Sequence, residues 1–464
     1  MKGRGRLGGR WWLAVSLLLG IGVVGCAAGY ARYMGKSLGR MQNRDWAGAL
    51  EKLEKPSGST NLFLYRVEKG LLLHYAGDWQ ASNNQFARAE RLIDKNSTRS
   101  VSREIASLLT NDAIRAYSGE EFERVLIHYY RALNYLRLGA LEEALVEGRK
   151  ANLRLADFAQ ASEVKLSYKN DAFLQYLTGH LFEAADEVND AYISYRDAAK
   201  GYAAYEKEFG FTPPAPLATD LQRTTRHLDF LQEWQDLQAR WGLDAYASKV
   251  PAPTVGTVTV FAESGFVGRK GQQELSLPIM ENENAAHVWV VSDRMVSRYH
   301  NPHLYHSGKV KYWLRVALPV FEPGRSSVTG VRLRIGDQVS RGWLVEDLDA
   351  IAAKSLQQKE DSILLRTAAR AIAKWVATEK AEDENEFLGI LVNLFGAGTE
   401  AADTRSWVSL PQTIWMARAA IPPGTTSVVL EFINTEGSVI DQHAFTDLET
   451  NGDGPLFLSW RSFR

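Results

Sequence analysis

Three histidines at three-residue intervals are the clearest candidate metal ligands of the chain: His300, His303 and His306. Neutral imidazoles bind zinc well, and three of them would leave one coordination position open. Their spacing argues against a site, because Pro302 disfavours a helix there and the middle side chain of an extended segment faces away from the other two. We interpret the stretch as a polar loop between strands, and we expect no metal and no cofactor.

A second stretch with chemical potential combines glycines with basic residues: Gly265, Gly268, Arg269, Lys270 and Gly271. It lacks the order of glycine, lysine and serine or threonine that cradles phosphate at a helix start, so we predict a hairpin loop. Acidic runs such as Glu142-Glu143 and Glu382–Glu384 are typical of solvated helix faces. The sequence shows no nucleophile-elbow serine, and we therefore expect no catalytic residue and no enzyme.

The single cysteine, Cys26, has the most distinctive chemistry. It follows a basic start and the apolar stretch Trp11–Val24, which is shorter than the roughly 20 residues of a membrane-spanning helix. The tetrapeptide Val23–Cys26 resembles the lipobox of bacterial lipoproteins, in which the chain is cleaved before the cysteine and the thiol receives a lipid. This predicts a signal peptide over residues 1–25 and a lipid anchor on Cys26. An uncleaved anchor with a chance cysteine is the alternative.

The same resemblance bears on location. In the enterobacterial type of lipoprotein sorting, a residue other than aspartate after the cysteine points to the outer membrane, and Ala27 occupies that place. In a host with two membranes, we therefore expect a lipid-anchored protein of the outer membrane that faces the periplasm.

Charge excludes one class of partner. Without the four cations of residues 1–25, the 54 basic residues fall to 50, against 55 acidic ones. A nucleic-acid-binding protein would show a basic surface, so we expect no nucleic acid. The remaining length allows two or three domains with a substantial core.

Two halves with different patterns follow the anchor. Residues 26–247 are poor in proline and show apolar residues at three- and four-residue spacing, which predicts helices and ends with a closing helix near Asp220–Trp241. A linker at 248–256 contains Pro251 and Pro253. Residues 257–464 alternate apolar and polar positions and predict a β-rich, sandwich-like domain.

The helical half contains three segments with identical internal spacing of small, large and turn residues. The first is Gly70, Leu73, Gly77, Trp79, Ser82, Phe86 and Ala89; the second is Ala132, Tyr135, Gly139, Leu141, Ala144, Gly148 and Ala151; the third is Gly179, Phe182, Asp186, Val188, Ala191, Tyr195 and Ala198. This spacing matches the tetratricopeptide pattern, in which small residues let two helices approach and a left-handed residue ends the first helix. A generic helical bundle is the alternative.

In the β-rich half, eight strands are predicted: Thr257–Ala262, His287–Ser292, Lys309–Leu318, Gly330–Ile335, Thr413–Ala419, Ser427–Ile433, Val439–Phe445 and Leu456–Trp460. A pair of helices is expected as an insert at about 344–400, with a break near Gln357–Asp361. The apolar run Phe387–Phe395 is too short to span a membrane, and we favour a buried helix over a surface helix that lies on lipid or on a partner.

Two stretches carry a resemblance to a family. They are Glu123–Tyr135 and the segment Ala402–Trp407, which is followed by Leu410-Pro411 and Ala417-Arg418. They are similar to an uncharacterised family of bacterial lipoproteins with tetratricopeptide-like helices in the N-terminal part. In the second stretch, we expect Asp403 and Arg405 to form a charge-assisted pair.

A tetratricopeptide-like array implies binding of a protein or peptide along its concave face, and we therefore expect a scaffold or adaptor at the inner face of the outer membrane that binds another envelope protein through the groove of the repeats. The candidate partner-binding residues, one helical turn apart within their helices, are Tyr65, Arg66, His128, Arg131 and Gln175. A structural subunit of an envelope or secretion assembly and a cell-wall-acting enzyme are the alternatives. The sequence leaves the oligomeric state open.

Overall fold

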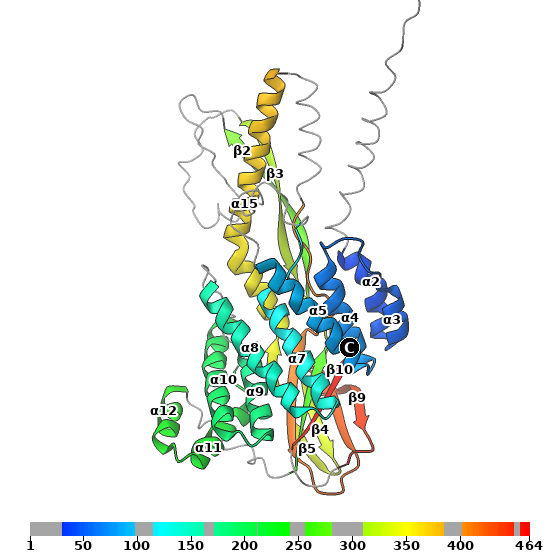
Figure 1. The fold of residues 1–464 in the computed structure, drawn as a ribbon, viewed down its shortest axis with the longest axis vertical. Coiled ribbons are helices and arrows are strands. Elements are labelled where there is room, and N and C mark those ends of the chain that lie inside the picture. Colours follow the sequence, from blue (N-terminus) through cyan, green and yellow to red (C-terminus); the bar gives the residue numbers. More distant parts are fainter. Residues whose placement is uncertain are drawn as a thin grey trace, which may run out of the picture.

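The chain folds as a mixed α+β protein, with helices in the first half and sheets in the second (Figure 1). The structure is a computed structural model, and it describes residues 30–97, 115–161, 171–210, 212–241, 256–280, 310–384, 401–449 and 455–464. Several predicted features lie outside these residues: Cys26 and the signal peptide, the strand at 287–292, the three histidines and the apolar run at 387–395.

Ten helices are described before the first strand. They are α2 (Tyr30–Gln42), α3 (Trp46–Lys52), α4 (Leu62–Tyr75), α5 (Trp79–Ser97), α7 (Glu121–Arg137), α8 (Leu141–Ala161), α9 (Ala172–Ala184), α10 (Val188–Phe209), α11 (Ala215–His227) and α12 (Leu231–Trp241). The prediction of a single closing helix near Asp220–Trp241 is wrong. Two helices, α11 and α12, cover this stretch, and Asp229 between them adopts a φ of 57°. Only a few residue types adopt that left-handed conformation readily, and it ends α11.

The helices α4/α5, α7/α8 and α9/α10 form three pairs, each joined by a short turn. The turn residues expected from the spacing all have a positive φ: 83° at Gly77, 72° at Gly139 and 63° at Asp186. This conformation ends the first helix of each pair and reverses the chain. Aspartate tolerates it better than most residues other than glycine, which explains how the third pair keeps the turn without a glycine.

Small residues let the paired helices approach closely. A Cβ atom on Gly179 would lie 2.4 Å from the ring of Tyr195, and one on Gly70 would lie 2.8 Å from the ring of Phe86. Gly148 faces the next pair instead, where a Cβ would lie 3.0 Å from Thr178. A small residue at 148 therefore sets the distance between α8 and α9.

We expect Gly179→Ala to lower the free energy of unfolding by about 1–3 kcal/mol, because the new methyl group overlaps the fully buried ring of Tyr195. Gly35→Ala is the matched control, since a Cβ at this helical glycine meets nothing within 4 Å and alanine favours a helix by about 0.5–1 kcal/mol. Urea unfolding of both variants measures the difference. Equal stability of the two variants would contradict the close packing of α9 on α10.

Two four-stranded sheets pack face to face. Sheet A has the order β10-β1-β7-β6, and sheet C has the order β5-β4-β8-β9. The strands of sheet A are β1 (Thr257–Ser264), β6 (Trp343–Asp347), β7 (Thr413–Ala420) and β10 (Leu456–Ser462); those of sheet C are β4 (Gly330–Ile335), β5 (Gln338–Arg341), β8 (Val428–Ile433) and β9 (Val439–Phe445). All neighbouring strands are antiparallel except β1 and β10. Apolar side chains of both sheets form one buried cluster between them.

The two faces of β1 have different partners. Val258, Val260 and Ala262 belong to the cluster between the sheets, whereas Phe261 belongs to a larger cluster that includes the helices. All eight residues of β1 are buried. Sheet A is therefore the middle of three layers, with the helix pairs on one side and sheet C on the other, and a continuous core joins the helical half to the β-rich half.

A long two-stranded hairpin and a long helix project from this body, as the upper part of Figure 1 shows. The hairpin consists of β2 (Arg269–Met280) and β3 (Val310–Glu322), and the helix is α15 (Leu348–Glu384), which contacts β3. We refer to these three elements as the arm. The predicted loop at Gly265–Gly271 is wrong in its second part, because Gly271 pairs with Val320 within the hairpin.

Of the predicted strands in the described residues, all are found within a few residues of their expected ends. The insert differs from the expectation. Its first residues form strand β6, and α15 continues without a break through Gln357–Asp361. The described part of the insert therefore contains one helix, and the residues predicted to form its partner helix are not among the described residues.

Candidate functional site

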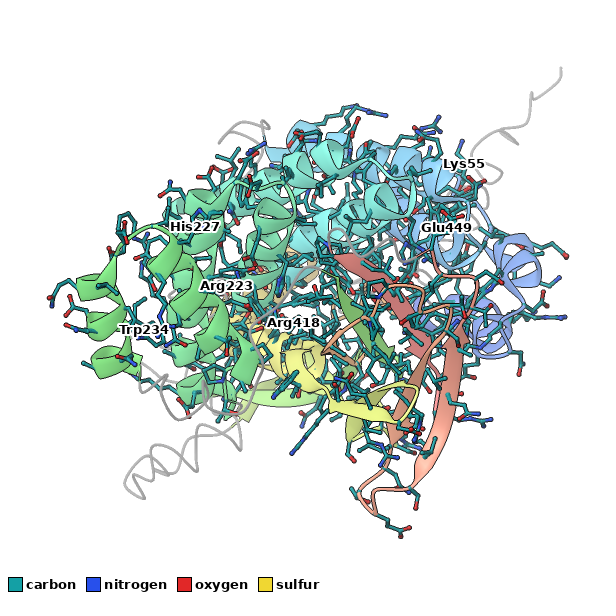
Figure 2. The ribbon with its side chains drawn as sticks, turned by 90° about the horizontal axis from the view of Figure 1, so that it is seen from below. Lys55, Arg223, His227, Trp234, Arg418 and Glu449 are labelled. Atoms are coloured by element: carbon teal, nitrogen blue, oxygen red, sulfur yellow. The ribbon has the colours of Figure 1, made fainter. Side chains whose placement is uncertain are left out.

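The contact between the helices and sheet A contains a buried ion pair. Arg418 of β7 donates two hydrogen bonds of 2.9 Å to the two carboxylate oxygens of Asp220 on α11. The hydroxyl of Tyr176 donates a third at 2.7 Å, and Arg223 contacts the same carboxylate. Figure 2 labels Arg223 and Arg418, which approach this carboxylate from the helices and from the sheet. Asp220 is fully buried, so this fork fixes α11 against the sheet where bulk water cannot screen it.

A second buried group lies on the same, helix-facing side of sheet A, at the edge that β10 forms. The guanidinium of Arg461, on β10, donates to the carbonyl oxygens of Ser409 at 2.7 Å and Leu410 at 2.9 Å, and to the hydroxyl of Tyr75 at 3.1 Å. The Tyr75 hydroxyl donates in turn to Glu263 on β1. Burial raises the pKa of the Glu263 carboxyl, although Arg461 and the tyrosine hydroxyl oppose this shift.

The segment Ala402–Leu410 passes between the helix pairs and the sheet. Its backbone N–H groups donate to two buried glutamates: Trp407 to Glu123 at 2.7 Å and Val408 to Glu68 at 3.1 Å. The indole of Trp407 is fully buried and lies against the rings of Phe86 and Tyr130, with ring centroids 5.8 and 6.0 Å away. Two buried carboxyl acceptors and an aromatic anchor thus hold this segment in the core.

The predicted pair of Asp403 and Arg405 is confirmed. Arg405 donates from Nε at 2.8 Å and from Nη2 at 2.7 Å to the two oxygens of Asp403. Its Nη1 also donates to the carbonyl oxygens of Thr60 and Arg115. Arg405 therefore ties the segment to the chain before α4 and to the chain before α7, and its side chain is almost fully buried.

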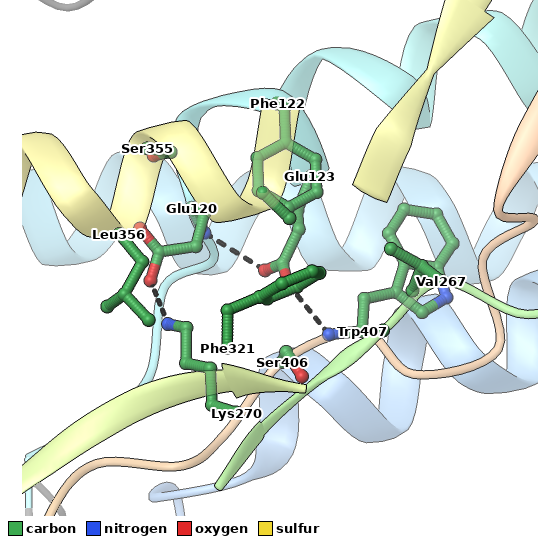
Figure 3. A pocket seen from close by; sticks show the side chains of 12 residues that line it. Glu120, Phe122, Glu123, Val267, Lys270, Phe321, Ser355, Leu356, Ser406 and Trp407 are labelled. Carbon is green, nitrogen blue, oxygen red and sulfur yellow. Dashed lines mark hydrogen bonds and ion pairs between the residues drawn. The ribbon is translucent and has the colours of Figure 1, made fainter. Parts of the chain in front are cut away.

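Figure 3 shows a small cavity beside this segment, where α7, the arm and Trp407 meet. Its volume of about 20 Å³ is enough for one water molecule. Glu120 forms an ion pair with Lys270 at the wall of the cavity, while Glu123 accepts hydrogen bonds from Tyr117 and from the N–H groups of Glu120 and Trp407. Two carboxyls three residues apart, one just before α7 and one in its first turn, thus have different surroundings.

Their acidities differ accordingly. Burial raises the pKa of Glu123 to about 7, and the neighbouring charge of Glu120 adds to the effect. Burial opposes the ionisation of Glu120 as well, but the cations Lys270 and Lys359 outweigh it and hold the pKa of Glu120 far below its ordinary value. Burial also raises the pKa of Glu68 to about 8.

These shifts predict a pH dependence of stability. A carboxyl whose pKa is higher in the folded state stabilises the fold fully below its unfolded pKa, and this contribution is lost as the pH rises through the folded value. Between pH 5 and 9, we therefore expect the melting temperature of the wild type to fall relative to that of Glu68→Gln, which keeps an acceptor and cannot ionise. Glu142→Gln, at an exposed position, is the control. A constant difference between wild type and Glu68→Gln across this range would refute the assignment.

A larger cleft of about 460 Å³ adjoins the small cavity at the base of the arm. It lies between the start of α7, β3, α15 and residues 401–405. Seven of its lining residues are cationic and three are anionic: Arg115, Arg124, Lys270, Lys359, Arg366, Arg370 and Arg405, against Glu120, Glu121 and Asp403. We refer to it as the basic cleft.

The five residues expected to bind a partner do not form an open surface. Tyr65, His128, Arg131 and Gln175 are buried, and Arg66 is partly buried and donates to Gln85. His128 and Arg131 contact Glu147 at 2.8 and 2.9 Å, within a network that joins α7 to α8. His128 and Arg131 therefore help to hold α7 against α8.

Other expected features can be placed only in part. Glu142 and Glu143 are exposed, as expected for a solvated helix face. Within the described ranges, three or more metal-binding side chains do not gather at any point, and no helix has the length and apolar character that crossing a membrane requires.

Sequence reasoning missed the buried acids that organise this region. Glu68 directly follows Val67 in a leucine-rich stretch, Glu123 directly follows Phe122, and Glu263 follows Phe261 and Ala262 near the end of the buried strand β1. A charged residue on an apolar face is a signal that could have identified them, because such a group requires a partner in the core. A comparison of the chain with protein-family models, curated proteins and solved structures finds no match.

Proposed function

We propose that this chain is a lipid-anchored scaffold of the bacterial envelope, cleaved before Cys26, which binds another envelope protein and performs no catalysis. The observation that carries the proposal is the contact between the helix pairs and sheet A. The inner side of the helices is occupied by the chain's own sheet, and the buried ion pair Arg418–Asp220 joins the two. The helices then act as a frame, and binding surfaces lie on the outside of the body and on the arm.

The helical frame is of the tetratricopeptide-like kind in this proposal. The small and turn residues at matching offsets support it, since they coincide with the close approaches at Gly70 and Gly179 and with the three left-handed turns. Here the array differs from an open peptide-binding groove, because side chains of sheet A fill the side that would receive a peptide. The sandwich-like sheets and the inserted arm complete the molecule.

The distance between the lipid and the body supports an attachment without a long tether. Tyr30 begins α2 and is buried, together with Met34 and Met41 of the same helix. Only Ala27, Ala28 and Gly29 separate Tyr30 from Cys26. Four extended residues span at most about 14 Å, so a lipid on Cys26 would hold the body close to the membrane surface.

The anchor is tested by Cys26→Ser, followed by fractionation of cells and labelling with a fatty acid. We expect the wild type to be processed, labelled and bound to the outer membrane, and the variant to be unlabelled and of unprocessed size. Labelling of the serine variant, or an unlabelled wild type, would overturn the anchor.

The partner is tested by a photo-reactive amino acid placed at Leu365 or at Leu231 in living cells. Both side chains are highly exposed, 72 % and 60 %; Leu365 lies on the arm and Leu231 begins α12 near the opposite end of the body (Figure 1). We expect a discrete protein adduct from the arm position and none from α12. The scaffold proposal fails if neither position gives an adduct with a protein while the chain is correctly located.

A further inference from the structure

The helix nearest to the proposed anchor, α2, belongs to a stretch of one-sided charge. The sequence contains no aspartate or glutamate before Asp45, whereas four cations lie between Cys26 and that residue: Arg32, Lys36, Arg40 and Arg44. The whole chain, in contrast, has a formal net charge of −1. Positive charge is therefore concentrated directly after the residue that would carry the lipid.

The two sides of α2 differ. One side is buried against the body, through Tyr30, Met34, Ser37 and Met41. Arg32, Lys36 and Arg40 are exposed and follow one another at four-residue intervals, so they form a row of about 12 Å along the other side of the helix. We refer to these three residues as the basic row. Figure 1 shows α2 and α3 at one edge of the body, at the end opposite to α12.

The described part of the chain leaves the basic row uncovered. A Cβ atom added at Gly35 or Gly39, which lie beside the row, would meet nothing within 4 Å. Arg40 contacts Asp45 at 2.9 Å, and its side chain is still 55 % exposed. Like charges four positions apart on a helix repel each other, so the row lowers stability unless counter-charges approach it from outside.

We propose that the basic row lies on the headgroups of anionic phospholipids, so that α2 faces the membrane in which the lipid of Cys26 is inserted. The inference rests on the anchor of the proposed function. A lipid on Cys26 would bring the start of α2 to within about 14 Å of the membrane surface. This is close to the distance of about 10 Å over which charges act in dilute salt.

The chemistry of the row suits such a surface. Each lysine or arginine near an anionic membrane strengthens binding by about fivefold. Tyr33, which is also exposed, adds an aromatic ring with a polar tip, a side chain favoured at the boundary between lipid and water. The acyl chains would hold the protein on the membrane, and the row would determine which side of the body faces it. An anchor next to the row favours phospholipid over an acidic protein as the counter-charge.

The test places one fluorescent label on the purified, acylated chain through a new cysteine. Gly39→Cys puts the label beside the row, where the side chain has room, and Leu231→Cys puts it at the start of α12. Acylation consumes Cys26, the only cysteine of the wild type, so the wild type should take up no label. A wild type that is labelled has an unmodified Cys26, which contradicts the anchor and removes the basis of the inference.

The labelled chains are reconstituted in phosphatidylcholine vesicles, with and without added phosphatidylglycerol, that contain a lipid with a quencher on its headgroup. We expect quenching of the label at residue 39 to be at least about twofold stronger in the anionic vesicles at low salt. High salt should remove this increase, because the cations are exposed. The label at residue 231 should be quenched weakly, and equally in both kinds of vesicle.

Two double variants, each carrying the label at residue 39, test the row itself. Arg32→Glu with Lys36→Glu should abolish the increase, since two of its three cations become anions. Lys207→Glu with Arg226→Glu makes the same change at exposed positions of α10 and α11 and should keep it. Melting temperatures near that of the wild type show that both double variants are folded.

The inference and the anchor can fail separately. Equal quenching at residue 39 in neutral and anionic vesicles, with an unlabelled wild type, overturns the inference and leaves the anchor intact. An increase that persists in Arg32→Glu with Lys36→Glu also overturns it. The comparison of the two kinds of vesicle uses the wild-type row, so it decides the question even if a double variant unfolds.

Discussion

Replacing Trp407 with alanine is expected to lower the free energy of unfolding by about 3–5 kcal/mol, one of the two largest effects of a single substitution that we anticipate. The indole is fully buried and packs against Phe86 and Tyr130, so its removal leaves a cavity that rings from two helices cannot close. The N–H of residue 407 would still donate to Glu123. The loss therefore reports on side-chain packing.

A graded series gives this prediction its controls. Trp407→Phe retains an aromatic ring and loses the indole N–H that donates to Ser409 at 3.1 Å, so a smaller loss is expected. Leu231→Ala, at a position that is 60 % exposed, should change the stability by less than about 0.5 kcal/mol. If chemical denaturation finds Trp407→Ala within about 1 kcal/mol of the wild type, the segment Ala402–Leu410 does not anchor the core.

Asp220→Ala is expected to cost a similar amount, about 3–5 kcal/mol, because it leaves the buried guanidinium of Arg418 without its carboxylate. The hydroxyl of Tyr176 loses its acceptor in the same variant. The pKa of Arg418 is raised: burial lowers it, but the nearby charge of Asp220 outweighs burial. An arginine guanidinium remains protonated even without an anionic partner, so Asp220→Ala leaves a buried positive charge without its carboxylate.

Two comparisons isolate this effect. Arg269→Ala breaks the exposed ion pair with Glu322, whose atoms lie 2.8 Å apart, and should cost only about 0–1 kcal/mol. The double variant Asp220→Leu with Arg418→Met removes both charges and should recover much of the stability lost in Asp220→Ala. A double variant as unstable as Asp220→Ala alone would show that lost packing, rather than an unpaired charge, causes the effect.

Local features of this fold could be predicted from the sequence because they depend on nearby residues. The left-handed turns at Gly77, Gly139 and Asp186 follow from the residue types and their spacing, and the pair of Asp403 and Arg405 lies within one segment. The alternation of Val331–Ile335 similarly marks β4. In each case the physical cause lies within a few positions along the chain.

The contacts that define the candidate site depend on residues far apart in the chain. Asp220 and Arg418 are 198 positions apart, and Trp407 and Glu123 are 284 apart. Local spacing predicts neither of these contacts, because both form only when the C-terminal half of the chain packs on the helices. The same cause explains why His128 and Arg131 were predicted to be accessible: an amphipathic pattern shows which face is polar, and it does not show that Glu90 and Glu147 cover that face.

Sheet A, which lies between the helices and sheet C, is completed late in the synthesis of the chain. The helices α4 to α11 are complete at His227, whereas β7 and β10, which complete the sheet, begin only at Thr413 and Leu456. Before those strands are synthesised, the apolar side of the helices is exposed to solvent and prone to aggregate. Chaperones usually protect such surfaces. Once the strands have docked, helices and sheets should melt together in a single cooperative transition, because neither layer retains a complete core of its own.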